Sequence, residues 1–115
     1  MTQKKYSEHF SAAEFRCRCG ACVPVEPPEE LINGLERLRE ICGGRPVIIT
    51  SGHRCAKHNA AVGGVSNSKH LTARAADVVI HGVTPQEITT LIKYLIPSLR
   101  ALPYKDYTHI DLRDI

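Results

Sequence analysis

Two histidines and one aspartate stand out because each interrupts a stretch that otherwise reads as buried. His70 and Asp77 lie seven residues apart in HLTARAAD, directly before the apolar run VVI, and His109 lies in the late stretch YTHIDLR. A buried carboxylate such as Asp77 is costly unless a cation compensates it. Two imidazoles and one carboxylate can bind zinc and leave the fourth position to water, as in hydrolytic sites. From spacing alone, an ordinary hydrogen bond remains the more common fate of a buried His or Asp.

Two predicted strands would carry these side chains. Residues 74–80 favour an extended chain, and residues 100–113 favour two short strands around a turn at Tyr104 to Asp106. Because side chains alternate along a strand, Asp77 falls on one face of 74–80 and its apolar neighbours fall on the other. His109 and Asp111 likewise share one face of the last strand. Asp111 could therefore orient a metal ligand or pair with Arg113, and the sequence does not separate these roles.

The remaining elements frame these strands. The sequence predicts helices at 11–15, 29–44 and 84–99 and a further strand at 45–50. Residues 51–68 are rich in Gly, Asn, Ser and His, which indicates a loop with one helical turn at 56–62. A loop of this length in a small domain is uncommon unless it is functional. The pattern predicts an α+β fold, with a small, mainly antiparallel sheet flanked by helices.

Length and composition fit one soluble globular domain over residues 1–115. The chain is 43% hydrophobic and 23% charged, with a formal net charge of +3. No stretch approaches the roughly 18 apolar residues that a membrane helix needs, and no secretory signal peptide is visible at the start. Lysines and arginines are scattered without an aromatic and basic recognition motif, so we expect no nucleic-acid partner.

Five cysteines leave a separate question open. They are Cys17, Cys19, Cys22, Cys42 and Cys55. Without an export signal, reduced thiols or a metal site are favoured over a disulfide framework. The cluster CRCGAC could bind zinc with a fourth ligand from Cys55, Cys42 or His9, although it lacks paired CxxC motifs. A disulfide and plain packing remain alternatives.

The stretch SGHRCAKHNAAVGGVSNSKHLTARAADV, followed by HIDLR, resembles the zinc D-alanyl-D-alanine carboxypeptidase family of peptidoglycan peptidases. That family also contains phage L-alanyl-D-glutamate endolysins and the D,D-dipeptidases of vancomycin resistance, and hedgehog signalling domains share its architecture. The resemblance covers three ordered motifs, S-G-x-R, S-x-H-x-x-G-x-A-x-D and a late H-x-D. It runs from about Phe15 to Arg113.

The resemblance implies a ligand set of His70, Asp77 and His109 for one zinc ion. It also implies that Arg54 holds a substrate carboxylate and that Asp106, three residues before His109, is the catalytic carboxylate. Zinc lowers the pKa of its bound water towards roughly 7, so Asp106 could accept the proton at neutral pH and later pass it to the leaving amine.

Three further positions follow from the same comparison. Ser68 matches the serine of the second motif, and His53 stands where relatives often carry an aromatic residue, so both are expected to contact substrate. Ala73 replaces the glycine of that motif. If the site requires a positive φ, alanine would strain the turn between His70 and Asp77.

The resemblance implies a zinc-dependent peptidase that cleaves an amide bond in peptidoglycan stem peptides, as a D,D-carboxypeptidase or as an L-alanyl-D-glutamate endopeptidase. The alternative is a non-catalytic zinc-containing module of the same fold that acts at the cell wall. We expect a monomer made in the cytoplasm that reaches the wall during phage lysis.

Overall fold

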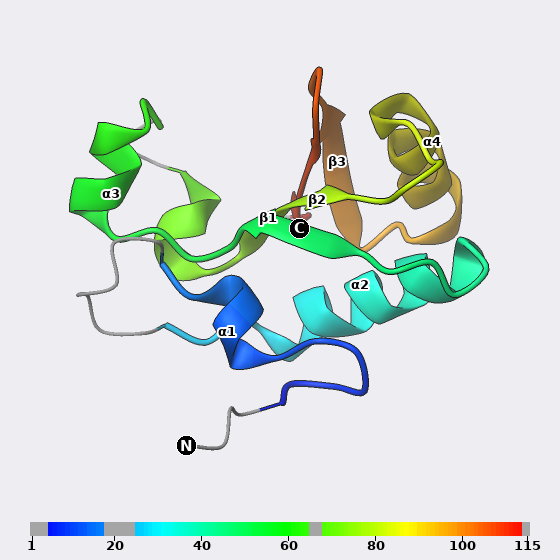
Figure 1. Cartoon of the computed structure of the whole chain (residues 1–115), viewed down its shortest axis with the longest axis horizontal. Coiled ribbons are helices and arrows are strands. Elements are labelled where there is room, and N and C mark those ends of the chain that lie inside the picture. The colour runs from blue at the N-terminus through cyan, green and yellow to red at the C-terminus, as the bar shows by residue number, and fades with distance from the viewer. Residues whose placement is uncertain (1–4, 18–24, 65–67, 114–115) are drawn as a thin grey trace.

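A four-stranded antiparallel sheet organises the fold, with strand order β1-β2-β4-β3 (Figure 1). The computed structural model describes residues 5–17, 25–64 and 68–113. The helices are α1 (Ala12–Phe15), α2 (Glu29–Ile41), α3 (Ala56–Ala61), the 3₁₀ turn η1 (Lys69–Thr72) and α4 (Pro85–Leu95). The strands are β1 (Ile48–Ser51), β2 (Ala75–Val79), β3 (Leu99–Pro103) and β4 (Thr108–Leu112). The predicted α+β fold with a small antiparallel sheet is confirmed.

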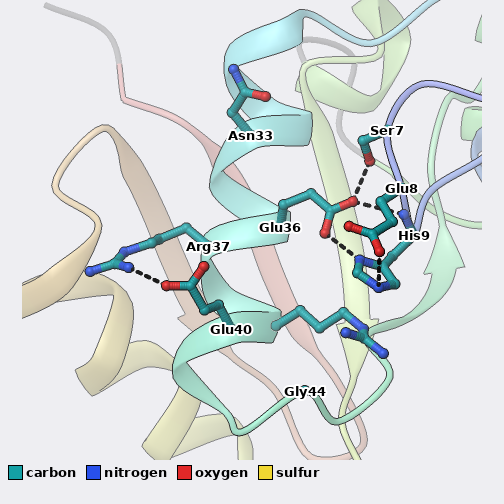
Figure 2. A pocket seen from close by; sticks show the side chains of 9 residues that line it. Ser7, Glu8, His9, Asn33, Glu36, Arg37, Glu40 and Gly44 are labelled. Carbon is teal, nitrogen blue, oxygen red and sulfur yellow. Dashed lines mark hydrogen bonds and ion pairs between the residues drawn. The ribbon is translucent and has the colours of Figure 1, made fainter.

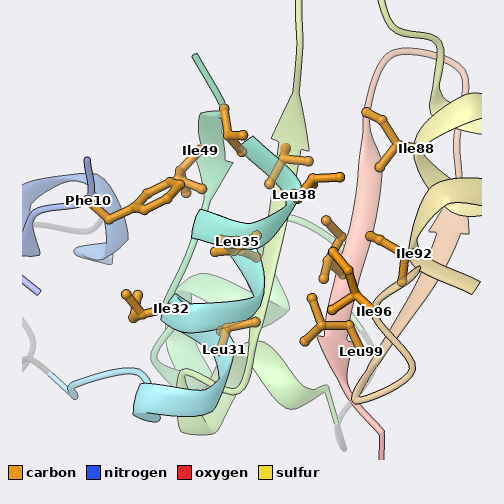
Figure 3. Packing of buried hydrophobic residues seen from close by; sticks show 14 of the residues in the cluster. Phe10, Leu31, Ile32, Leu35, Leu38, Ile49, Ile88, Ile92, Ile96 and Leu99 are labelled. Carbon is orange, nitrogen blue, oxygen red and sulfur yellow. The ribbon is translucent and has the colours of Figure 1, made fainter. Parts of the chain in front are cut away.

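One face of the sheet packs into the hydrophobic core. Strand alternation directs Val78 and Ile110 into the core, where they meet the apolar sides of α2 and α4 (Figure 3). On α2, Leu31, Leu35 and Leu38 recur at helical spacing and are fully buried. Burying each such leucine contributes about 1.5–3 kcal/mol. The core therefore fixes the sheet and leaves its other face available for polar side chains.

Helix α4 shows how local sequence sets the ends of an element. Its start is a capping box, since the Thr84 hydroxyl accepts from the Glu87 N–H (3.2 Å) and the Glu87 carboxylate accepts from the Thr84 N–H (3.0 Å). The helix ends at Leu95, earlier than the predicted residue 99. The cause is Pro97, which disfavours helical backbone at the residue before it. Leu99 begins β3 instead.

The segment between β1 and β2 joins the N-terminal region to the sheet. A Cβ at Gly52 would lie 2.6 Å from the Cα of Phe15, so only glycine fits between these two backbones. The N–H of His53 donates to the Phe15 carbonyl at 2.8 Å. The predicted loop at 51–68 thus contains α3 where a helical turn was predicted, and η1 follows it. The first residues of this loop are held against the end of α1.

Candidate metal centre

Three predicted ligands lie together on the polar face of the sheet. Each of His70, Asp77 and His109 offers a ligand atom, and these atoms all lie within 4.8 Å of one another. Asp77 Oδ1 is 3.3 Å from His70 Nε2 and 3.1 Å from His109 Nδ1. In a tetrahedral zinc site with bonds of 2.0–2.1 Å, neighbouring ligands are about 3.3 Å apart. The donor types and spacings therefore fit a zinc ion.

Sheet register brings two of these residues together. Asp77 on β2 and His109 on β4 are direct partners in the antiparallel pairing, although 32 residues separate them in sequence. Side chains of such partners project from the same face with their Cβ atoms about 5 Å apart. The strands thus preset one carboxylate and one imidazole before any ion binds.

The third ligand, His70, is held by the loop that follows β1. Its Nδ1 lies 2.6 Å from the Gly52 carbonyl oxygen, which can only accept, so Nδ1 carries the proton. In the neutral ring, Nε2 then carries the lone pair, and it lies on the side that faces Asp77 Oδ1. Two backbone contacts add to this: the His70 N–H donates to Ser68 Oγ (3.2 Å), and the Arg54 N–H donates to the His70 carbonyl (2.9 Å).

The turn after His70 has the conformation that the glycine motif implied. Ala73 adopts φ 58° and ψ 23°, the left-handed region, and no other non-glycine residue among those described has a positive φ. The predicted strain at this position is therefore present in the backbone. The turn still delivers the chain into β2 and places Asp77 opposite His109.

Asp111 orients His109 from the other side. Its Oδ2 lies 2.8 Å from His109 Nε2, and its carboxylate accepts two hydrogen bonds from Arg100, at 3.2 and 2.9 Å. Lys69 Nζ lies 3.7 Å from Asp111 Oδ1. The open question about Asp111 is thus answered by geometry, since it orients a ligand and pairs with Arg100. Sequence reasoning missed Arg100, which lies opposite Asp111 because four residues, 104–107, connect the paired strands where the predicted turn had three.

Proximity of these groups shifts their pKa values. Burial alone would raise the pKa of Asp77, but the neighbouring imidazoles of His109 and His70 lower it to about 2. Burial would lower the pKa of His109, but the hydrogen bonds to Asp111 and Asp77 raise it to about 9. Burial likewise opposes the fall in the pKa of Asp111, which His109 and Arg100 bring to about 2. In the metal-free protein, a protonated His109 compensates the two carboxylates, so the cluster is built to hold positive charge.

The cluster lies in a cavity of about 510 Å³ whose wall is rich in cations. Arg54, Lys69 and Arg100 line it, and so do Ser68 and the glycines Gly63 and Gly64 of the long loop. The rings of Tyr104 and Tyr107 stack at its edge, with centroids 4.8 Å apart and an interplanar angle of 12°. A pocket of this kind suits an anionic ligand that lies over the candidate metal ligands.

Arg54 is the cation best placed to contact a ligand above the cluster. Its Nη2 lies 3.9 Å from Asp77 Oδ2, and its side chain is mostly shielded from solvent. Its buried Nε has no hydrogen-bond partner among the described residues. A planar guanidinium with such spare donors can bind a carboxylate through two hydrogen bonds.

Two predicted site residues lie away from this cavity. Asp106 is exposed on the turn between β3 and β4 and lines a smaller cavity with Val83 and Pro85. His53 is 4% exposed and does not line the cavity; burial lowers its pKa. The roles of Asp106 and His53 stay predictions that their placement here does not support.

A larger hollow, of about 640 Å³, lies between the N-terminal segment and α2 (Figure 2). The Glu36 carboxylate on α2 is already bound by Ser7 and His9, whose Nδ1 is 2.7 Å from Glu36 Oε1. The charged groups in this hollow therefore satisfy one another. The group of potential metal ligands thus lies in the smaller of these two cavities.

The described residues contain no helix that is long and apolar enough to cross a membrane. The sequence profile described as peptidase M15 matches residues 8–111, nearly the whole chain. The chain belongs to the peptidase M15 family, whose members are zinc-dependent peptidases. No curated protein matches it. The resemblance seen in the sequence motifs is thereby confirmed at the level of the family.

Proposed function

We propose that this protein is a zinc-dependent peptidase that hydrolyses an amide bond in peptidoglycan stem peptides, with His70, Asp77 and His109 as the metal ligands. The observation that carries this proposal is the clustering of the three ligand atoms within 4.8 Å, with both imidazole nitrogens at 3.1–3.3 Å from Asp77 Oδ1, close to the edge of a zinc tetrahedron. Membership of the peptidase M15 family supports the same chemistry.

Zinc at this position would polarise the scissile carbonyl and activate a water molecule. The chain's own residues bind and orient the substrate. Arg54 would hold a free carboxylate of the peptide, since its shielded guanidinium faces the cavity and retains an unused donor. Lys69 and Arg100 extend this positive wall. Stem peptides carry the free carboxylates of D-alanine and D-glutamate, so their charge complements the cavity.

Asp106 is our proposed proton acceptor. Of the carboxylates among the described residues that line the cavity, Asp77 is a ligand and Asp111 is held by His109 and Arg100. Asp106 directly precedes Tyr107, which does line the cavity. The role requires the exposed Asp106 carboxylate to turn from the smaller cavity towards this one.

Replacing Asp106 by Asn tests that role. We expect kcat to fall by about 10²–10⁴-fold, which is the usual contribution of a general base, while the zinc content stays at that of the wild type. The neighbouring Lys105→Gln is the control and should keep its kcat. An unchanged kcat in Asp106→Asn would assign proton transfer to another group.

Mass spectrometry of purified muropeptides tests the function as a whole. We expect a product that disappears with a chelator and returns with zinc, and that is absent in His70→Ala but present in the exposed control His81→Ala. Loss of one alanine would identify a D,D-carboxypeptidase, and cleavage at L-alanyl-D-glutamate would identify an endopeptidase. Bound zinc without product from any muropeptide would instead favour a non-catalytic cell-wall module.

A further inference from the structure

Two cysteines lie side by side on the other edge of the loop that holds His70. Cys17 follows α1 and is 2% exposed, and Cys55 precedes α3. Their sulfur atoms are 3.8 Å apart, although 38 residues separate them in sequence. The metal centre described above uses neither cysteine, so this sulfur pair needs a separate account.

The sulfur separation has a chemical meaning. A disulfide would require about 2.05 Å, so the two sulfurs are not bonded to each other. Tetrahedral zinc has Zn–S distances of about 2.3 Å, which places neighbouring sulfurs about 3.8 Å apart. The observed sulfur–sulfur distance of 3.8 Å equals this tetrahedral edge. In the first cluster the bonds to zinc would be shorter, and the nitrogen–oxygen distances of 3.1 and 3.3 Å are correspondingly shorter.

Backbone donors also face both sulfurs. The Cys55 N–H donates to Cys17 Sγ at 3.3 Å, and the His58 N–H donates to Cys55 Sγ at 3.5 Å. Hydrogen bonds of this kind stabilise negative charge on sulfur, and a thiolate is the form of cysteine that binds a metal ion. Each sulfur of the pair thus accepts a backbone hydrogen bond, an arrangement that is compatible with two metal-bound thiolates.

We propose that Cys17 and Cys55 are ligands of a second metal ion of the zinc class, distinct from the ion at His70, Asp77 and His109. Both thiols release their protons to solvent as the ion binds. Cys17 and Cys55 supply two of the ligands, and metal-binding experiments have to identify the others. Cys19 and Cys22 of the CRCGAC stretch lie outside the described residues.

The location gives this ion a structural role. Cys17 lies two residues after Phe15, whose backbone packs against Gly52, and Cys55 directly follows Arg54. An ion between the two sulfurs would tie the N-terminal segment to the loop whose Gly52 carbonyl orients His70. Its removal should therefore loosen that loop without removing any ligand of the first ion.

Metal content and cobalt substitution test the proposal on the whole chain. We expect two zinc ions per chain in the wild type, one in Cys17→Ser and in Cys55→Ser, and two in the control Cys42→Ser. Cobalt-loaded wild type should show the intense ultraviolet sulfur-to-cobalt charge-transfer band. His70→Ala should keep this band and Cys55→Ser should weaken it, and its intensity counts the thiolates.

A single metal per chain without a sulfur-to-cobalt band would overturn the proposal, and so would a Cys17–Cys55 disulfide detected by mass. Should Cys17→Ser fail to fold, alkylation of the wild type decides the matter. Metal should then protect Cys17 and Cys55 and leave Cys42 unaffected; equal labelling with and without metal refutes the site. None of these readouts depends on peptidase activity, so a failure of the proposed function stays distinguishable.

Discussion

Asp77 shows how one buried charge can determine a site at the scale of a single residue. Its side chain reaches both imidazoles through one oxygen and lies 3.9 Å from Arg54 through the other. A carboxylate in this position is stable only among cations, whether imidazolium, guanidinium or a metal ion. The strand places it there because Ala76 and Val78, on either side of it, fill the core on the opposite face.

Asp111→Asn tests how far the outer partner controls the metal. The amide cannot provide the negative charge that orients and polarises His109, so we expect zinc affinity to fall by about 10–100-fold. Competition with a chelator of known affinity measures the change. Arg113→Gln, at the neighbouring exposed position, should bind zinc as the wild type does. Equal weakening in both variants would mean that the effect does not arise from the contact between Asp111 and His109.

Ala73→Gly tests the strained turn. Alanine in the left-handed region costs roughly 1–2 kcal/mol, whereas glycine adopts it freely, although glycine also gains freedom in the unfolded chain. We expect a net stabilisation of up to about 1 kcal/mol in urea denaturation. The control Ala75→Gly, in β2, should destabilise by about 0.5–1 kcal/mol because a strand does not need positive φ. A destabilised Ala73→Gly would mean that the buried methyl group outweighs the strain.

The sequence could identify the candidate metal ligands but not all their partners. His70, Asp77 and His109 were accessible because strand alternation and motif spacing both single them out. Arg100 was missed, because counting outward from the predicted three-residue turn pairs it with Ile110 and not with Asp111. The meeting of Cys17 with Cys55 was one of several open pairings, since nothing local specifies which of two distant segments pack together. At His53 the motif position predicts substrate contact while the side chain is buried, so that role stays a prediction.

At the scale of elements, α2 links the N-terminal segment to the core. Its apolar side buries three leucines, and on its other side Glu36 binds Ser7 and His9 (Figure 2). One helix thus holds both the sheet and the segment that precedes α1. Periodicity predicted the helix, but it carried no information about Glu36, because a surface glutamate looks the same whether or not a distant loop docks on it.

Glu36→Gln tests this docking through its pH dependence. Burial opposes the shift, but hydrogen bonds from Ser7 and His9 lower the pKa of Glu36 below its ordinary value. A lowered pKa means stabilisation above the unfolded pKa near 4.5 that is lost as pH falls. We expect Glu36→Gln to be about 1 kcal/mol less stable at pH 7, with the difference from wild type shrinking in acid. Urea denaturation of both proteins at pH 7 and in acid measures this difference in stability, and the exposed Glu40→Gln is the control. A difference in stability that stays constant with pH would exclude the charge of Glu36 as its cause.

For the whole molecule, the ligands come from η1, β2 and β4, so a bound ion connects the long loop to the centre of the sheet. Zinc at 100 times its dissociation constant should stabilise the fold by about 2.7 kcal/mol. We expect a chelator to lower Tm in a thermal scan, and zinc to restore it. Cys55→Ser and His70→Ala should each show part of this response. A Tm that is insensitive to both chelator and zinc would mean that neither site binds metal in the folded chain.

The strand order itself was beyond sequence reasoning. Each strand could be located by composition, but neighbours in the sheet are chosen by the packing of segments far apart in the chain. β1 and β2 pair across α3 and η1, and β4 pairs with both β2 and β3. The local signals identified the hairpin of β3 and β4 alone.

Strand β4 lies between two strands that both precede it in the chain. During synthesis, β1, β2 and β3 leave the ribosome before β4, so β2 has only β1 beside it and Asp77 lacks the His109 imidazole until residue 112 has emerged. A chain interrupted before that point would expose one edge of β2 and hold an incomplete set of candidate ligands. The nascent protein thus completes its sheet and its candidate metal centre in one event, the insertion of the central strand β4.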